Sequence, residues 1–175
     1  MQKKFKSASF WALAVVLSAT ALTAQTLKVA IVNAQKAVAD TQEIKKAQAD
    51  LATKYKPRQA DIQKLQSDLQ QIQSQLRGPN VTPATEQQLT AQGQEKQKRL
   101  QRLTEDLQAD FNQDRSDILG RAGQRMQDVI KKLAEAKGLD VVIDISNTLY
   151  FKPALDMTAE ATTAYDQAYP SAPVK

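Results

Sequence analysis

The sequence predicts a mostly α-helical protein in which a long antiparallel coiled-coil hairpin projects from a short β-sheet base. Three observations support this prediction. Apolar residues recur at alternating intervals of four and three over a long stretch, a break rich in glycine and proline divides that stretch, and short β-rich segments flank it. The composition agrees with long helices, because aromatic residues make up only 5% of the chain and it contains only 5 glycines.

The N-terminus has the three parts of a secretory signal. In order, these are a basic start (Lys3, Lys4, Lys6), an apolar run (residues 10–17) and small residues (19–24). We therefore expect residues 1–24 to be a signal peptide, cleaved between residues 21 and 26. A retained membrane anchor is the less favoured alternative, because the run is far shorter than the ~20 residues that span a bilayer. Cleavage removes three lysines from a formal charge of +5, leaving +2, so no nucleic-acid partner is predicted.

Residues 27–33 (LKVAIVN) alternate in polarity, which predicts a short strand. A helical arm is expected from residue 34 to residue 137, folded back on itself at a tip formed by residues 78–83. In its outgoing half, ten positions are spaced alternately by four and three residues, and eight of them are apolar. The ten positions are Ile44, Gln48, Leu51, Tyr55, Arg58, Ile62, Leu65, Leu69, Ile72 and Leu76. Such a sustained heptad seam is typical of a coiled-coil strand.

Pro57 lies inside this outgoing half. A proline in a helix interior removes one backbone hydrogen bond and clashes with the preceding turn, at a cost of about 3 kcal/mol. Two interpretations are nearly equally favoured. Either Pro57 makes a kink or hinge near residues 53–57, or the long helix begins at Pro57 and a separate shorter helix precedes it.

The segment GPNVTP at residues 78–83 ends one helix and begins the next. We expect Thr82 to be the N-cap of the return helix and Pro83 its first residue. The return seam continues at Leu89, Gly93, Lys96, Leu100, Leu103 and Leu107, then shifts to Phe111, Ile118, Ala122, Met126, Val129 and Leu133. Lys137 and Gly138 form a helix stop. A helix of this length spans about 80 Å, so it must project from the body of the protein.

The predicted base consists of residues 27–33 and 138–168. A second strand is expected at residues 139–145, a third at 148–151 and a short helix at 159–168, followed by a flexible tail at 169–175. An isolated sheet of two or three strands is marginal in water, so we expect several copies to share one apolar core. The residues predicted to form this oligomer core are Leu27, Val29, Ile31, Leu139, Val141, Ile143 and Ile145.

The chain contains no His and no Cys, which removes the commonest catalytic base, thiol nucleophile and transition-metal ligands. No glycine-rich phosphate loop occurs either. We therefore expect a protein that is not an enzyme, with no catalytic residues, cofactor or metal site. Asp140, Asp144 and Asp156 could form a carboxylate cluster, but solvated surface charge is the favoured interpretation.

Cations outnumber anions near the tip of the predicted hairpin. The candidate contact residues are Lys64, Arg77, Lys96, Lys98, Arg99 and Arg102. They suggest weak contact with anionic lipid or with a client protein, although an ordinary face of mixed charge is slightly favoured. The glutamine-rich stretch at residues 59–108 is interpreted as a solvated helix face rather than an aggregation-prone tract, because the heptad seam runs through it.

Several short motifs, taken in order, resemble the Skp/OmpH family of periplasmic chaperones for outer-membrane proteins. They are the strand VAIVN at 29–33, FNQDR at 111–115, LDVVID at 139–144, Tyr150, and DMT at 156–158. The resemblance implies a homotrimer with a central β body, whose helical arms enclose a cavity for unfolded outer-membrane proteins without using ATP. It also implies a periplasmic location. Pro57 and the sequence of the tip depart from the family pattern.

Two other functions fit the same sequence less well. One is a periplasmic coiled-coil adaptor or structural hairpin, although such proteins usually carry additional β domains. The other is an envelope lipid-binding protein that uses the basic residues near the tip.

Overall fold

The computed structural model describes residues 26–79 and 81–171, so the predicted signal peptide and the end of the predicted tail lie outside the described residues. Its elements are, in order, β1 (Val29–Val32), α1 (Ala34–Ala39), α2 (Gln42–Leu76), α3 (Pro83–Lys137), β2 (Val141–Asp144), two short 3₁₀ turns and α4 (Thr158–Ala168). The chain is mostly helical with a small sheet, as the sequence predicts.

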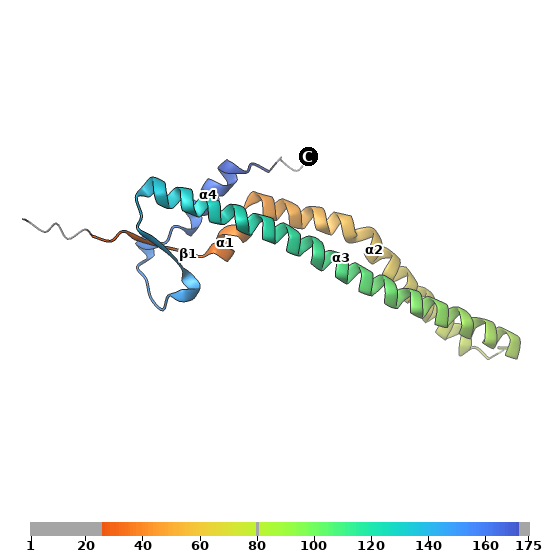
Figure 1. Cartoon of the computed structure of the whole chain (residues 1–175). Coiled ribbons are helices and arrows are strands. Elements are labelled where there is room, and N and C mark those ends of the chain that lie inside the picture. The colour runs from red at the N-terminus through yellow and green to blue at the C-terminus, as the bar shows by residue number, and fades with distance from the viewer. Residues whose placement is uncertain (1–25, 80, 172–175) are drawn as a thin grey trace, which may run out of the picture.

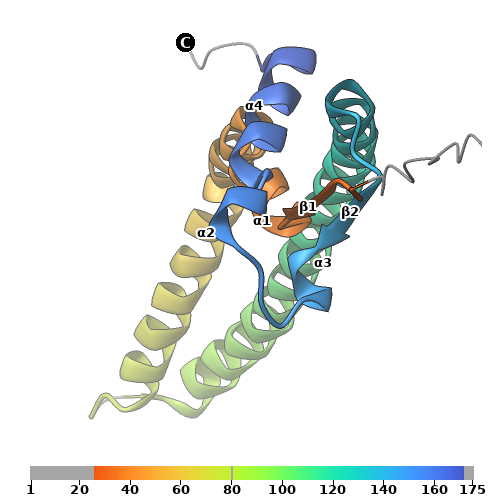
Figure 2. The same cartoon turned by 90° about the vertical axis from the view of Figure 1, so that its left-hand side faces the viewer.

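The helices α2 and α3 lie side by side and project from a base that contains β1, β2, α1 and α4 (Figures 1 and 2). Ion pairs join Lys54 to Asp114 and Asp68 to Lys96. Positions later in α2 therefore face positions earlier in α3, and the two helices run in opposite directions. We call this helix pair the arm.

Both ends of α3 have specific caps. Thr82 is the N-cap, its side chain accepting a hydrogen bond from the backbone N–H of Thr85, and Pro83 is the first helical residue. At the other end Gly138 has φ +60°, the left-handed conformation that favours glycine. The backbone N–H of Leu139 then donates to the carbonyl of Ala134 at 2.9 Å, which closes the helix end.

The arm begins later than the sequence indicated. Instead of one helix from residue 34, the short helix α1 ends at Ala39 and α2 begins at Gln42. Thr41 causes the break, because its fully buried hydroxyl donates to the Val38 carbonyl and its side chain accepts from the Ile44 N–H. The helix α1 therefore belongs to the base, where Ala37 and Val38 are buried.

Pro57 lies inside one continuous helix, so the alternative that a helix begins at this residue is wrong. Figure 1 shows α2 changing direction near its middle, where the colour passes from orange to yellow. A proline at this position supplies no N–H to the preceding turn and explains such a bend. Whether the bend acts as a hinge stays a prediction.

Within the residues that the structure describes, the sheet has two strands, not three. Strands β1 and β2 pair in parallel, with Val29 opposite Val141 and Ile31 opposite Ile143. The predicted third strand at residues 148–151 is wrong, because that segment forms a loop between the 3₁₀ turns 145–147 and 153–155. The turn begins because the Asp144 carboxylate accepts hydrogen bonds from the backbone N–H and the hydroxyl of Ser146.

The core of the base lies between the sheet and the helices α1, α3 and α4. Its buried members come from almost every element of the base and from the roots of α2 and α3: Ala30, Val32, Ala37, Val38, Ile44, Ala122, Met126, Val129, Met157, Ala161 and Tyr165. Ala30 and Val32 lie on one face of β1, so Val29 and Ile31 lie on the opposite face.

The three aspartates singled out in the sequence do not form a cluster that could bind a ligand. Instead, each carboxylate accepts a hydrogen bond from a backbone N–H group: Asp140, Asp144 and Asp156. Asp140 accepts a hydrogen bond from the backbone N–H of Lys28 at 2.7 Å, and Asp144 accepts one from the N–H of Ala34 at 3.2 Å. Asp156 accepts from the N–H of its neighbour Thr158 at 2.8 Å. Hydrogen bonds from Ser146 hold the pKa of Asp144 below its ordinary value. Within the described residues, no group of acidic side chains could hold a metal ion.

The end of α3 provides a test of this fold. We expect Gly138→Ala to lower the free energy of unfolding by about 1–2 kcal/mol, because alanine is strained at positive φ. The matched control is Gly120→Ala in the middle of α3, where an added Cβ would meet nothing within 4 Å. This control should raise stability by up to about 1 kcal/mol. Urea denaturation followed by circular dichroism measures both changes, and equal effects of the two substitutions would contradict the assigned helix end.

Candidate functional site

The predicted seam residues lie along the contact between α2 and α3. In α2, Leu51, Leu65, Leu69 and Ile72 are buried, whereas Ile62 and Leu76 are half-buried. On α3 the seam residues Leu100, Leu103 and Leu107 are all half-buried. The arm thus hides a narrow apolar stripe and leaves part of it accessible along α3.

A polar and aromatic cluster joins the two helices at mid-arm. Tyr55 is 1% exposed, and its hydroxyl donates to the Asp114 carboxylate at 2.7 Å. The Phe111 ring meets Tyr55 edge-to-face, with centroids 5.5 Å apart. Lys54 pairs with the same carboxylate, and its hydrogen bond is the main cause that lowers the pKa of Asp114. Arg58 adds an ion pair with Asp110 one turn further along.

A second cluster, which we call the root clamp, holds the arm where it leaves the base. The Arg125 guanidinium donates to both Glu43 carboxylate oxygens at 3.0 Å, and the Tyr165 hydroxyl donates to Glu43 at 2.6 Å. Arg125 also lies over the Tyr169 ring, 4.9 Å from its centroid. The root clamp therefore joins α2, α3 and the C-terminal helix α4. Sequence reasoning missed it, because no spacing rule relates residues from three separate helices.

The six predicted tip cations do not gather at the tip. Lys98, Arg99 and Arg102 lie 15 to 19 residues after the start of α3, or about 22–28 Å along the helix. Lys96 pairs with Asp68 at 2.8 Å, and Lys64 lies 13 residues before Arg77. Of the six, only Arg77 lies at the end of the arm, where it is the C-cap of α2.

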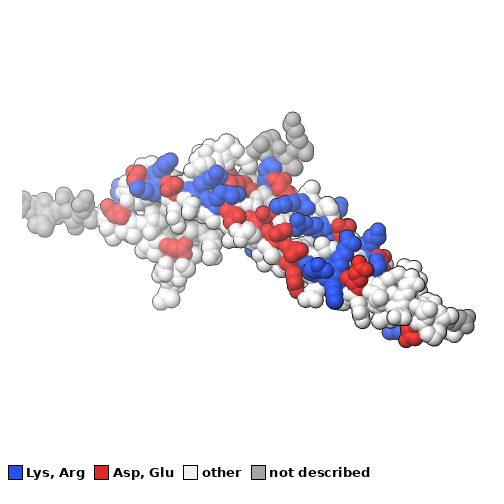
Figure 3. Space-filling model, turned by 45° about the vertical axis from the view of Figure 1, so that its right-hand side comes forward, with Lys and Arg blue, Asp and Glu red and all other residues white. Residues whose placement is uncertain are grey.

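The end of the arm is nearly uncharged. Residues 69–79 and 81–94 contain only two charged side chains, Arg77 and Glu86, and eight glutamines. Figure 3 shows this end as mostly uncharged surface, in contrast to the mixture of both signs along the shaft. We call this segment the neutral arm end. It contains a small groove of about 240 Å³ between Ile72, Leu89 and Gly93.

Large apolar side chains are exposed on the base. They are Leu27 (67% exposed), Val141 (40%), Leu149 (108%), Tyr150 (80%) and Leu155 (37%). We call these five residues the base surface. Leu149 and Tyr150 lie in the segment where a third strand was predicted, and sequence reasoning did not single out Leu155.

The predicted oligomer-core residues are not equally accessible. Leu27 and Val141 belong to the base surface, and Ile31 is only 3% exposed. Val29, Leu139, Ile143 and Ile145 are half-buried. Leu139 packs against the protein's own core, and Ile31 is the least available of the seven for contact with another copy.

Among the helices that the structure describes, none is long and apolar enough to cross a membrane.

Two comparisons relate this chain to known proteins. The family model described as outer membrane protein (OmpH-like) matches residues 28–165. The crystal structure of an OmpH-like protein, a candidate outer membrane chaperone, from Caulobacter crescentus CB15 superimposes with a TM-score of 0.70 and 20% identity. The match covers 85% of this chain and 89% of the other, and at this identity it establishes the fold. No curated protein matches the chain in sequence.

Because of the root clamp, we expect the free energy of unfolding to fall at alkaline pH. Burial and the hydrogen bond to Glu43 raise the pKa of Tyr165 from 10.0 to about 12. The contribution of this group to stability is therefore complete below pH 10 and is lost as the pH rises through the folded value. We expect Tyr165→Phe to cost about 1 kcal/mol near neutral pH, and to make the loss of stability between pH 10 and 12 less steep.

Urea denaturation at several alkaline pH values measures this effect. The control is Thr163→Ala, because Thr163 is exposed on the same helix and its hydroxyl does not ionise in this range, so the variant should keep the alkaline slope of the unmodified protein. If Tyr165→Phe and the unmodified protein lose stability equally over this range, the role given to the Tyr165 proton is wrong.

Proposed function

The chain belongs to the OmpH-like outer membrane protein family, and we propose that it is an ATP-independent holdase chaperone of the periplasm. In this proposal it binds unfolded outer-membrane proteins between helical arms and keeps them from aggregating. The observation that supports it best is the shape of the chain, in which one long helix pair projects from a small base (Figure 1). Family membership also argues against an enzyme.

The surface of the arm fits a protein that must hold many sequences and then release them. Half-buried leucines on α3 offer small apolar contacts, and the glutamines of the neutral arm end offer amide donors and acceptors. Because only Arg77 and Glu86 carry charge there, a client would not be selected by its own charge. Many weak contacts of this kind give useful affinity through multivalency while each contact stays reversible.

We propose that the base surface is covered by other copies of the chain in a trimer. A sheet of two short strands is marginal in isolation. Leu149 and Tyr150 are almost fully exposed in the loop beside it. The apolar side chain of Val141, at the start of β2, is also exposed. Burying such residues between copies would stabilise the base. Three arms would then surround a common cavity, and a bend at Pro57 would help the arms to adapt to clients of different size.

The unmodified protein should suppress the light scattering of a denatured outer-membrane β-barrel diluted into buffer, without ATP and at about one trimer per client. We expect Leu149→Asp combined with Tyr150→Asp to reduce the mass measured by light scattering after gel filtration from trimer to monomer, because it places charge on a buried contact. The variant should then suppress aggregation much less, since multivalency is lost.

The control is Lys152→Asp, which adds negative charge to an exposed polar position of the same loop. It should remain trimeric and active. A well-folded oligomer that never suppresses aggregation would contradict the chaperone proposal. A double variant that keeps the full oligomer mass would contradict only the assignment of the base surface.

A further inference from the structure

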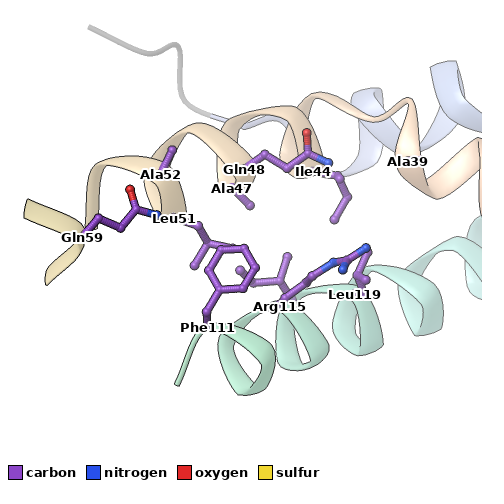
Figure 4. Close-up of a pocket in the computed structure, with 11 residues that line it drawn as sticks. Ala39, Ile44, Ala47, Gln48, Leu51, Ala52, Gln59, Phe111, Arg115 and Leu119 are labelled. Carbon is purple, nitrogen blue, oxygen red and sulfur yellow. The ribbon is translucent and has the colours of Figure 1, made fainter. Parts of the chain in front are cut away.

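The two helices of the arm are incompletely packed between the root clamp and the mid-arm cluster of Tyr55, Phe111 and Asp114. A cleft of about 500 Å³ opens there and is lined mainly by apolar side chains, among them Leu51 and Ile118. Figure 4 shows these side chains between the two helices. The space is far larger than the ~30 Å³ that one water molecule occupies in the liquid, so the helices do not interlock at this level. We call it the arm cleft.

The part of α2 beside the arm cleft, residues 44–56, has polar contacts with α3 only near its two ends. At the base end the root clamp holds the residue just before it, and at the far end Tyr55 donates to the Asp114 carboxylate at 2.7 Å. Within the described residues, the side chains at positions 44–53 make no hydrogen bond or ion pair with α3. The seam position in the middle is occupied by an exposed glutamine, Gln48. We call residues 44–56 the strap.

Pro57 follows the strap and weakens the helix at that point. It has no N–H to donate to the Thr53 carbonyl, and its ring presses against that carbonyl. Pro57 is exposed and lies about 200° around the helix from Tyr55, so the clash is on the side of α2 away from α3. Turns that are pushed apart on that side bend the helix toward α3, and Figure 1 shows the change of direction. The angle of this bend therefore sets how closely the strap can approach α3.

The mid-arm contacts fasten the strap at the bend itself. Tyr55 precedes Pro57 and bonds to Asp114, whereas Arg58 follows it and pairs with Asp110. Contacts with α3 therefore lie on both sides of the proline. Together they hold the bend at one angle and keep the end of the strap against α3.

Most of this fastening comes from one hydrogen bond. The side chains of Lys54 and Arg58 are 58% and 48% exposed, so water competes for them and each of their ion pairs contributes little. The Tyr55 hydroxyl makes the stronger contact, because it donates to a charged acceptor from a residue that is only 1% exposed. Lifting the strap would replace this hydrogen bond with bonds to water and would separate the Tyr55 ring from Phe111.

We propose that the strap is a movable part of the arm, hinged at Pro57 and latched by the contact of Tyr55 with Asp114. When this latch is released, the strap lifts from α3 and widens the arm cleft. The apolar side chains that line the cleft, of which Leu119 is already 38% exposed, then become accessible. This device goes beyond the proposed chaperone function, and its test uses no client, so the failure of one proposal leaves the other standing.

Double electron–electron resonance between two spin labels tests the proposal. The labels are placed at Ala49→Cys on the strap and at Ser116→Cys on α3, both exposed positions of a chain that has no cysteine of its own. Labelled chains are diluted into an excess of unlabelled chains, so that only distances within one chain are measured. We expect one dominant distance in the otherwise unmodified protein. Tyr55→Phe combined with Asp114→Ala should increase a population at longer distance about tenfold, because the hydrogen bond to a charged acceptor is lost.

Two further variants make the result specific. Asp68→Ala removes the ion pair with Lys96, which also joins the two helices but lies farther along the arm, and it should keep the single distance. In the Pro57→Ala background the restored backbone hydrogen bond stiffens α2, so the latch substitutions should increase the longer distance much less. The proposal is wrong if the latch substitutions leave the distance distribution unchanged, or if Asp68→Ala changes it as much as they do. It is also wrong if the latch substitutions act equally with and without Pro57.

Discussion

The ion pair between Glu43 and Arg125, closed by the Tyr165 hydroxyl, fixes the point where the arm leaves the base. Beyond this point α2 and α3 have only each other to pack against, so the direction of the whole arm depends on how its first turns are held. The C-terminal helix α4 supplies that support through Tyr165 and through Asp166, which accepts a hydrogen bond from the Gln42 N–H at 2.9 Å. The helix α4, although it is distant in sequence, thus holds the first turn of α2 in place.

The sequence was most informative where local physics decides the structure. The seam from Leu51 to Leu76, the cap at Thr82 and the left-handed Gly138 all follow from spacing and backbone preference. It was least informative where distant side chains decide. Thr41 breaks the first helix through a buried hydroxyl, and Asp144 turns the chain where a third strand was predicted. The root clamp depends on residues from three separate helices, so periodicity could not reveal it.

Charge divides the arm into two parts with different roles. Along the shaft, pairs such as Lys54 with Asp114 and Lys96 with Asp68 cross between the helices and keep them in register. Each such exposed pair contributes little, so the apolar seam, buried on α2 and half-buried on α3, supplies most of the stability of the arm. The neutral arm end has almost no ionic contacts and leaves its glutamines and its groove beside Gly93 accessible. This division fits an arm whose two helices are held together near the base and can change conformation more easily at the neutral arm end, where we propose that clients bind.

Backbone hydrogen exchange, compared between the free protein and its complex with an unfolded outer-membrane β-barrel, tests the central claim most directly. The claim is that the arm contacts the client and that the base holds the assembly together. Added protection should therefore appear in residues 69–79 and 81–107, whereas exchange in β1, α1 and α4 should stay unchanged. Added protection confined to the base, with none along the arm, would contradict the account.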